Sequence, residues 1–128
     1  MMDKSKIFII LSYIFVIYIS LLALIFIFQR SLMYFPVKEK ISKSFYKNTK
    51  LKIIDISTSD GLILKSLYKK SETNINKTIL VFHGNAGHIG HRVNKFKPFI
   101  DKGYGLLLLE YRGYGENKGK PTKLGLYK

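Results

Sequence analysis

A glycine-rich segment follows a short apolar run near the middle of the chain. Residues 80–87 read Leu-Val-Phe-His-Gly-Asn-Ala-Gly. We expect a strand to turn into a helix here, so that backbone N–H groups of the loop and of the helix start converge on an anion. Glycine at positions 84 and 87 lets the backbone approach a ligand closely. The candidate residues for stabilising an oxyanion are His83, Gly84, Asn85, Ala86 and Gly87.

Three kinds of anion-binding loop can join a strand to a helix. A Walker loop needs a Gly-Lys-Ser/Thr ending, which is absent here. A dinucleotide fingerprint needs G-x-G-x-x-G, whereas Gly84, Gly87 and Gly90 give G-x-x-G-x-x-G. The third kind is the oxyanion loop of an α/β-hydrolase, in which one N–H polarises the scissile carbonyl. A tight glycine turn that only connects the two elements remains an alternative.

No candidate nucleophile follows the loop. The last serine is Ser71, and the chain contains no cysteine. Enzymes with an oxyanion loop need an activated nucleophile. Ser57, Ser59 and Ser66 precede the loop and lie in or beside a predicted hairpin, away from it. We therefore assign no catalytic residue; the triad that the family resemblance described below implies is absent from these 128 residues.

The three histidines, at positions 83, 88 and 91, form the pattern H-x4-H-x2-H. This spacing matches no established zinc pattern, and no carboxylate lies nearby in the sequence. We therefore predict no metal site and no cofactor. His88 and His91 are expected in the first helical turn, partly exposed. Glu110 is the carboxylate expected near the loop, in a salt bridge with Arg112.

A β-hairpin is predicted before the loop. Residues 51–57 and 62–68 are rich in β-branched and apolar types and flank Asp60-Gly61, a strong hairpin signal. Residues 77–83 follow as a continuous apolar run, typical of a strand buried on both faces of a parallel sheet.

A helix and a second strand complete a βαβ unit. Residues 89–102 predict a helix that stops at Gly103, because four apolar residues recur at helical spacing: Ile89, Val93, Phe96 and Ile100. Residues 104–111 predict a strand, whose leucines at 106–109 are expected to form an unpaired edge. Thr122 is a candidate cap for a helix beginning at Lys123.

The first quarter of the chain has the character of a membrane segment. Residues 7–28 are uncharged and rich in Ile, Leu and Phe, long enough for a transmembrane helix. A signal peptide and a buried core helix are the alternatives. More basic residues follow the segment than precede it, which places the soluble part on the cytoplasmic side. The predicted divisions are a basic flank at 1–6, a transmembrane helix at 7–28, a juxtamembrane connector at 29–50 and an incomplete α/β domain at 51–128.

The formal net charge of +14 raises the question of an anionic partner. The lysines are scattered, and no basic helix, zinc-finger spacing or aromatic RNA-binding signature organises them. We therefore predict no nucleic-acid partner. The lipid bilayer is the expected partner, and adhesion of the connector lysines to anionic lipid is a secondary possibility.

Three stretches of the sequence together resemble a known family. Residues 80–92, the Tyr-Arg-Gly-Tyr-Gly motif at 111–115 and Gly-Lys-Pro-Thr at 119–122 are similar to the amino-terminal half of membrane-anchored α/β-hydrolases of the Bem46, ABHD13 and ABHD17 type. The boundary at residues 29–36 is similar too. Asn117 and Lys123 depart from the family, which usually has serine and an acidic residue there.

The resemblance implies a fold class and a reaction. The fold would be α/β, a partial α/β-hydrolase fold built from a hairpin and one βαβ unit. Asn85 or Ala86 would supply an oxyanion N–H, and complete members would hydrolyse esters, thioesters or amides. Since the nucleophile elbow would follow the helix near Lys123, this truncated chain is expected to be inactive alone, unless a separately encoded C-terminal half supplies the rest. The alternative is a membrane-tethered interaction or scaffold protein without catalysis.

Overall fold

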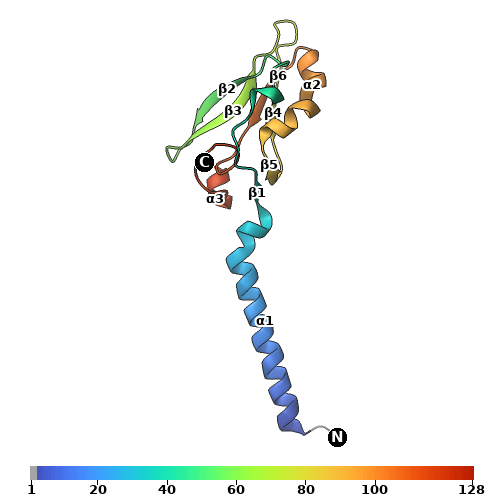
Figure 1. Cartoon of the computed structure of the whole chain (residues 1–128), viewed down its shortest axis with the longest axis vertical. Helices are drawn as coiled ribbons and strands as arrows, with labels where there is room; N and C mark the ends of the chain where they lie inside the picture. Colours follow the sequence, from blue (N-terminus) through green and yellow to red (C-terminus); the bar gives the residue numbers. More distant parts are fainter. Residues whose placement is uncertain (1–2) are drawn as a thin grey trace. The chain divides into compact units, whose positions relative to one another are not determined.

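The structure is a computed structural model that describes residues 3–128. Residues 1–2, part of the predicted basic flank, lie outside the described residues. The chain divides into two compact units, Met1–Met33 and Tyr34–Lys128. Helix α1 (Lys4–Met33) makes up the first unit, and a small α/β domain makes up the second (Figure 1).

Helix α1 contains the whole predicted membrane segment and extends past it at both ends. Its mean hydropathy reaches 2.8, and none of its residues is buried. Thirty residues of helix are about 45 Å long, more than the roughly 30 Å of a hydrocarbon core. Ser12 and Ser20 donate their hydroxyls to the carbonyls of Phe8 and Val16, one turn earlier. The helix therefore has the length and composition of a membrane-spanning segment, which a signal sequence shares.

The second unit is organised around a four-stranded sheet with the order β2-β3-β6-β4. The predicted hairpin is confirmed as β2 (Lys52–Ser57) and β3 (Ile63–Lys69), paired antiparallel from Ser57 opposite Ile63. Gly61 in its turn has φ +81°, a backbone conformation that glycine adopts without strain.

The βαβ unit is also present. Strands β4 (Thr78–Phe82) and β6 (Gly105–Leu109) pair in parallel, and between them lie the 3-10 turn η2 (Ile89–Arg92) and helix α2 (Val93–Asp101). Gly103, with φ +88°, ends the helix as predicted. The core fills the space between one sheet face and this helix, and its fully or nearly fully buried members are Ile41, Leu51, Leu67, Ile89, Val93, Ile100, Leu106 and Leu108.

The strand at 104–111 is buried as predicted, but its expected edge position is wrong, and so is the expectation that the strand at 77–83 is buried on both faces. Strand β6 lies between β3 and β4, with Leu106 and Leu108 fully buried, so it is not an unpaired edge. Strand β4 lies at one edge of the sheet instead, and β2 lies at the other. Its side chains alternate, and Leu80 and Phe82 remain 53% and 60% exposed. The reason is that strand order differs from chain order, which an apolar run does not reveal.

The segment predicted as a connector has structure of its own. It contains β1 (Phe35–Pro36) and the 3-10 turn η1 (Lys43–Phe45). Strand β1 pairs in parallel with β5 (Ala86–Gly87), which places the connector directly against the glycine-rich loop. Ile41 is 2% exposed, so the connector also contributes to the core. Near the end of the chain, Thr122 caps α3 (Lys123–Leu126) as predicted, accepting a hydrogen bond from the Gly125 N–H.

Candidate functional site

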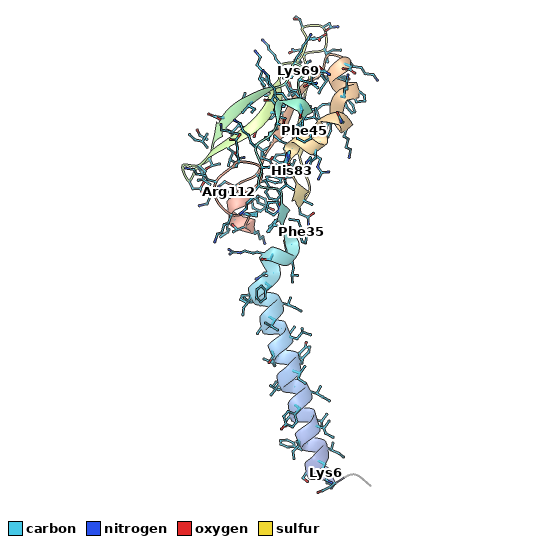
Figure 2. All side chains as sticks on the ribbon, in the orientation of Figure 1. Lys6, Phe35, Phe45, Lys69, His83 and Arg112 are labelled. Carbon is cyan, nitrogen blue, oxygen red and sulfur yellow. The ribbon has the colours of Figure 1, made fainter. Side chains whose placement is uncertain are left out.

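The loop at residues 83–87 lies between β4 and η2, and every one of its carbonyl oxygens accepts a hydrogen bond. Figure 2 shows His83 inside the α/β unit. The donors are six groups from six residues. Tyr111 Oη donates to the His83 carbonyl, and His83 Nδ1 donates to that of Gly84. The Asn85 carbonyl accepts from both Phe35 N and Tyr114 Oη. Arg92 Nη2 donates to the Ala86 carbonyl, and Val37 N donates to that of Gly87. Because a peptide group is planar, these contacts fix the direction of the loop N–H groups as well.

The start of the helix does not offer an anion site, contrary to the prediction. The Ile89 N–H donates to Glu110 Oε2 at 2.9 Å. The Gly90 N–H donates to His88 Nδ1 at 3.0 Å, and the His91 N–H donates to the His88 carbonyl. Protein groups thus already occupy the first three donors of η2, and the anion at this helix start is the Glu110 carboxylate. Any oxyanion donors must come from the loop itself.

Glu110 forms its ion pair with His83 and not with Arg112. The Nε2 and Oε1 atoms of that pair are 2.7 Å apart, and neither side chain is exposed. The nearby Ser66 hydroxyl accepts the backbone N–H of Glu110. Glu110 therefore connects the end of β4, the end of β6 and the start of η2.

Arg112 instead binds Asp60, in the turn of the β2–β3 hairpin. Its Nη1 and Nη2 atoms donate to the two carboxylate oxygens at 2.7 and 2.9 Å. These hydrogen bonds hold the pKa of the Asp60 carboxyl well below its usual range. The pair anchors the hairpin to the loop that follows β6. Sequence reasoning missed it because the two residues are far apart in the chain.

A cavity of about 690 Å³ lies beside the glycine-rich loop. Its size is in the range of small-molecule sites, and aromatic side chains contribute much of its wall. Burial raises the pKa of the Tyr111 and Tyr114 hydroxyls, which keeps both as neutral donors to the loop. The lining residues are Tyr34, Phe82, His83, Gly84, Asn85, Tyr111, Tyr114, Lys123, Leu126, Tyr127 and Lys128.

No serine lines this cavity within the described part of the chain. Ser66, in β3, is fully buried and serves as an acceptor for a backbone N–H. His88 is fully buried, although it was expected to be partly exposed, and His91 is exposed as expected. These two rings lie together with Glu39. The loop residues His83, Gly84 and Asn85 therefore line the cavity, whereas His88 and His91 do not.

Sequence reasoning missed the roles of the two tyrosines. The Tyr-Arg-Gly-Tyr-Gly motif was recognised only as a family likeness, yet Tyr111 and Tyr114 hold the loop carbonyls. Asn117 was also noted only as a departure. Its side chain accepts the Lys65 N–H at 2.8 Å and donates to the Lys65 carbonyl, so it pairs with β3 as a strand would.

Curated proteins from plants, fungi and animals are similar to this chain. It is 35% identical over 113 residues to the α/β-hydrolase domain-containing protein WAV2 of Arabidopsis thaliana, which covers 83% of this chain and 37% of WAV2. It is 33% identical over 118 residues to protein bem46 of Schizosaccharomyces pombe, covering 84% of this chain and 40% of bem46. A shorter match, 39% over 61 residues, is to the lysophosphatidylserine lipase ABHD12 of Danio rerio, covering 46% of this chain and 16% of the lipase. The chain thus spans less than half the length of these relatives.

The fold is similar to that of a solved esterase. The Pyrococcus furiosus esterase Pf2001 superposes with a TM-score of 0.55 at 21% identity, covering 73% of this chain and 36% of the esterase. At this identity the likeness concerns the fold. No protein-family profile matches the chain.

Proposed function

Because this chain belongs to the Bem46-like α/β-hydrolases and spans part of their length, we propose that residues 83–87 form the oxyanion loop of a serine hydrolase. The reaction is hydrolysis of an ester, thioester or amide through an acyl-enzyme. One observation carries the proposal: all five loop carbonyls accept a hydrogen bond from the protein, four of them from residues outside the loop and that of Gly84 from the His83 ring.

Hydrogen bonds to the loop carbonyls are important for catalysis, because an oxyanion hole works only if its N–H donors are oriented before charge develops. The carbonyls of Gly84 and Asn85 belong to the same peptide groups as the N–H groups of Asn85 and Ala86. Fixing those oxygens therefore fixes the two candidate donors. A Cβ at Gly84 would meet no atom within 4 Å, so the site has room for a substrate carbonyl beside these donors.

The nucleophile, acid and histidine would come from polypeptide outside these 128 residues. The chain has no serine after Ser71 and no cysteine, and the buried Ser66 has no path to a substrate. An oxyanion hole without a nucleophile retains little acyl-transfer activity. We therefore expect the 128-residue chain to be inactive in hydrolysis by itself.

The open edge of the sheet at β4 is the place where we expect that polypeptide to bind. Strand β4 has β6 on one side, and on the other side its backbone has no strand partner among residues 3–128. Leu80 and Phe82 project from it on the face opposite α2, more than half exposed. A strand added at this edge would continue the sheet and bring its own following loop beside Gly84.

Helix α1 would attach the domain to a bilayer. An uncleaved anchor is favoured by a helix of 30 residues, which is longer than the apolar region of a signal peptide. Arg30 and the lysines at positions 38, 40, 43 and 47 outnumber Lys4 and Lys6, which favours a cytoplasmic location for the α/β unit.

A loop graft tests the oxyanion assignment. Residues 83–87 replace the corresponding residues of the Pyrococcus esterase, and hydrolysis of a nitrophenyl ester is measured. We expect the graft to keep activity and the graft carrying Ala86→Pro or Asn85→Pro, which removes one N–H, to lose about 10²–10³ in kcat. Ala86→Ser keeps the N–H and serves as the matched control. A folded double-proline graft as active as the control would refute the assignment.

Fluorophosphonate labelling tests inactivity. The full chain in detergent is treated with the probe beside an intact serine esterase, and we expect label on the esterase only. Covalent labelling of this chain would show that it carries its own nucleophile.

A second candidate function is a membrane-tethered binding protein, which the exposed Leu80 and Phe82 favour. Membrane extracts would then yield a stable complex with a protein unlike a hydrolase. Recovery of a polypeptide with G-x-S-x-G would support the hydrolase instead.

A further inference from the structure

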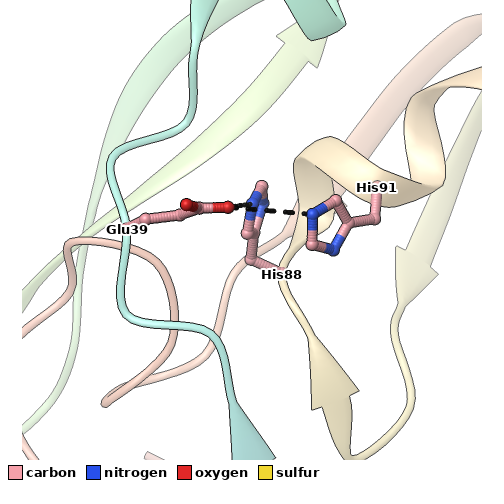
Figure 3. Close-up of side chains that lie close together, drawn as sticks. All are labelled: Glu39, His88 and His91. Atoms are coloured by element: carbon pink, nitrogen blue, oxygen red, sulfur yellow. Dashed lines mark hydrogen bonds and ion pairs between the residues drawn. The ribbon is translucent and has the colours of Figure 1, made fainter.

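Three potential metal ligands from two distant segments meet beside η2. Glu39 comes from the connector, and His88 and His91 come from the turn that follows the glycine-rich loop. Glu39 Oε1 lies 3.2 Å from His88 Nε2 and 3.9 Å from His91 Nε2. Dashed lines mark these contacts in Figure 3. One ligand atom from each residue lies within 4.8 Å of the other two.

The two distances from Glu39 are close to those of a tetrahedral site. Bonds of about 2.0–2.1 Å to nitrogen and oxygen place neighbouring ligands of zinc about 3.3 Å apart. The Glu39–His88 separation already has this value, and His91 needs to move by less than 1 Å toward Glu39. We propose that Glu39, His88 and His91 bind a divalent transition-metal cation of the zinc class.

The surroundings hold both rings in place. The His88 and His91 rings lie 3.9 Å apart, and Phe45 contacts each of them edge-on at 5.4 Å. A Cβ on Gly90 would lie 2.6 Å from His88 Cε1, so glycine is what allows the His88 ring to occupy its position. Rings that are already held by packing lose little entropy when they bind a metal.

The charges around the site also suit a cation, because Glu39 supplies a carboxylate beside the two imidazoles. Arg92 is the adjacent cation, and its guanidinium is directed at the Ala86 carbonyl at 2.7 Å. The side chains of Glu39 and His91 are 58% and 37% exposed, so the remaining coordination position faces solvent.

One hydrogen bond opposes binding. His88 Nδ1 accepts the Gly90 N–H, which places the ring proton on Nε2, the atom facing Glu39. A metal on Nε2 displaces that proton to Nδ1, and the Gly90 N–H loses its acceptor. The site is therefore weaker than one whose second nitrogen already donates to an oxygen.

Cobalt binding to the full chain tests the site independently of hydrolysis. The chain is purified in detergent without a histidine tag and titrated with Co²⁺. We expect one Co²⁺ per chain, the visible absorption of a tetrahedral centre, displacement by Zn²⁺ and a rise in the unfolding midpoint. Glu39→Gln and His91→Ala should each weaken binding about tenfold or more.

Glu72→Gln, at an exposed carboxylate elsewhere, is the matched control and should bind as the wild type does. Both Glu39 and His91 are partly exposed, so their variants should remain folded, which tyrosine fluorescence verifies. Absence of a tetrahedral spectrum at millimolar Co²⁺, or equal affinity in Glu39→Gln, Glu72→Gln and wild type, would refute the proposal. Because neither readout involves an ester, these outcomes are separate from those for the oxyanion loop.

Discussion

His83 Nε2 lies 2.7 Å from Glu110 Oε1, in a pair that no solvent reaches. The two residues follow parallel neighbouring strands, β4 and β6, and the second Glu110 oxygen accepts the Ile89 N–H. One carboxylate therefore holds the first residue of the glycine-rich loop and the start of the helix after it. The shape of the loop depends on this buried contact.

Replacing Glu110 should destabilise the domain strongly. Glu110→Ala leaves a buried histidine without its partner, which typically costs about 3–5 kcal/mol. Urea unfolding of the full chain in detergent, followed by tyrosine fluorescence, measures the free energy of unfolding. The control is Glu116→Ala, which removes a partly exposed carboxylate 3.9 Å from Lys65 and should cost less than about 1 kcal/mol. Similar losses in both variants would contradict the role of Glu110.

The Asp60–Arg112 pair should make stability depend on pH in acid. Arg112 lowers the pKa of Asp60 in the folded state, so the unfolded state takes up the proton first as the pH falls. The stabilisation is complete above the unfolded pKa of about 3.9 and is lost as the pH falls below it. We expect the unfolding midpoint of Asp60→Asn to lie below that of the wild type at pH 5–7.

That difference should shrink below pH of about 4, where proton uptake by Asp60 in the unfolded state offsets the ion pair that the folded state still holds. Thermal unfolding of both proteins across this range gives the comparison. Asp55→Asn, at an exposed position in β2, should change the free energy of unfolding by less than about 0.5 kcal/mol. A constant difference between wild type and Asp60→Asn at all pH values would contradict the linkage.

Two glycines near the loop should respond differently to alanine. A Cβ at Gly90 would lie 2.6 Å from His88 and 2.9 Å from Phe45, so Gly90→Ala should cost about 1–3 kcal/mol by overpacking. A Cβ at Gly84 would meet no atom within 4 Å, so Gly84→Ala should change stability by less than about 0.5 kcal/mol. Denaturant midpoints distinguish them, and a larger loss in Gly84→Ala would be inconsistent with this packing.

The open β4 edge should control association. Leu80→Glu and Phe82→Glu change side chains that are more than half exposed, so each should alter the stability of the chain by less than about 0.5 kcal/mol. Both should reduce self-association in light scattering, since charge on an edge strand opposes pairing. Leu67→Ala, at a fully buried position, is the contrast and should cost about 2–5 kcal/mol. Unchanged association in both glutamate variants would show that another surface is responsible.

Local signals in the sequence were sufficient for most elements. Asp60-Gly61 fixed the hairpin, because the turn and its two strands are neighbours in the chain. The period of Ile89, Val93 and Ile100 located the helix, and all three are buried. Residues 80–92 and 111–115 identified the family and fold class, which the relatives and the esterase confirm.

The sequence by itself thus determined the apolar α1, the βαβ order, the family and the absence of cysteine and of any serine after Ser71 in these 128 residues. Tertiary structure alone decided that β4 is an edge, that Glu110 pairs with His83, that Asp60 holds Arg112, and that Glu39 reaches His88 and His91. The physical reason is the separation along the chain of the residues that interact. Helical period and turn chemistry act between neighbours in the chain, whereas strand order and buried charge pairs join residues up to 52 positions apart.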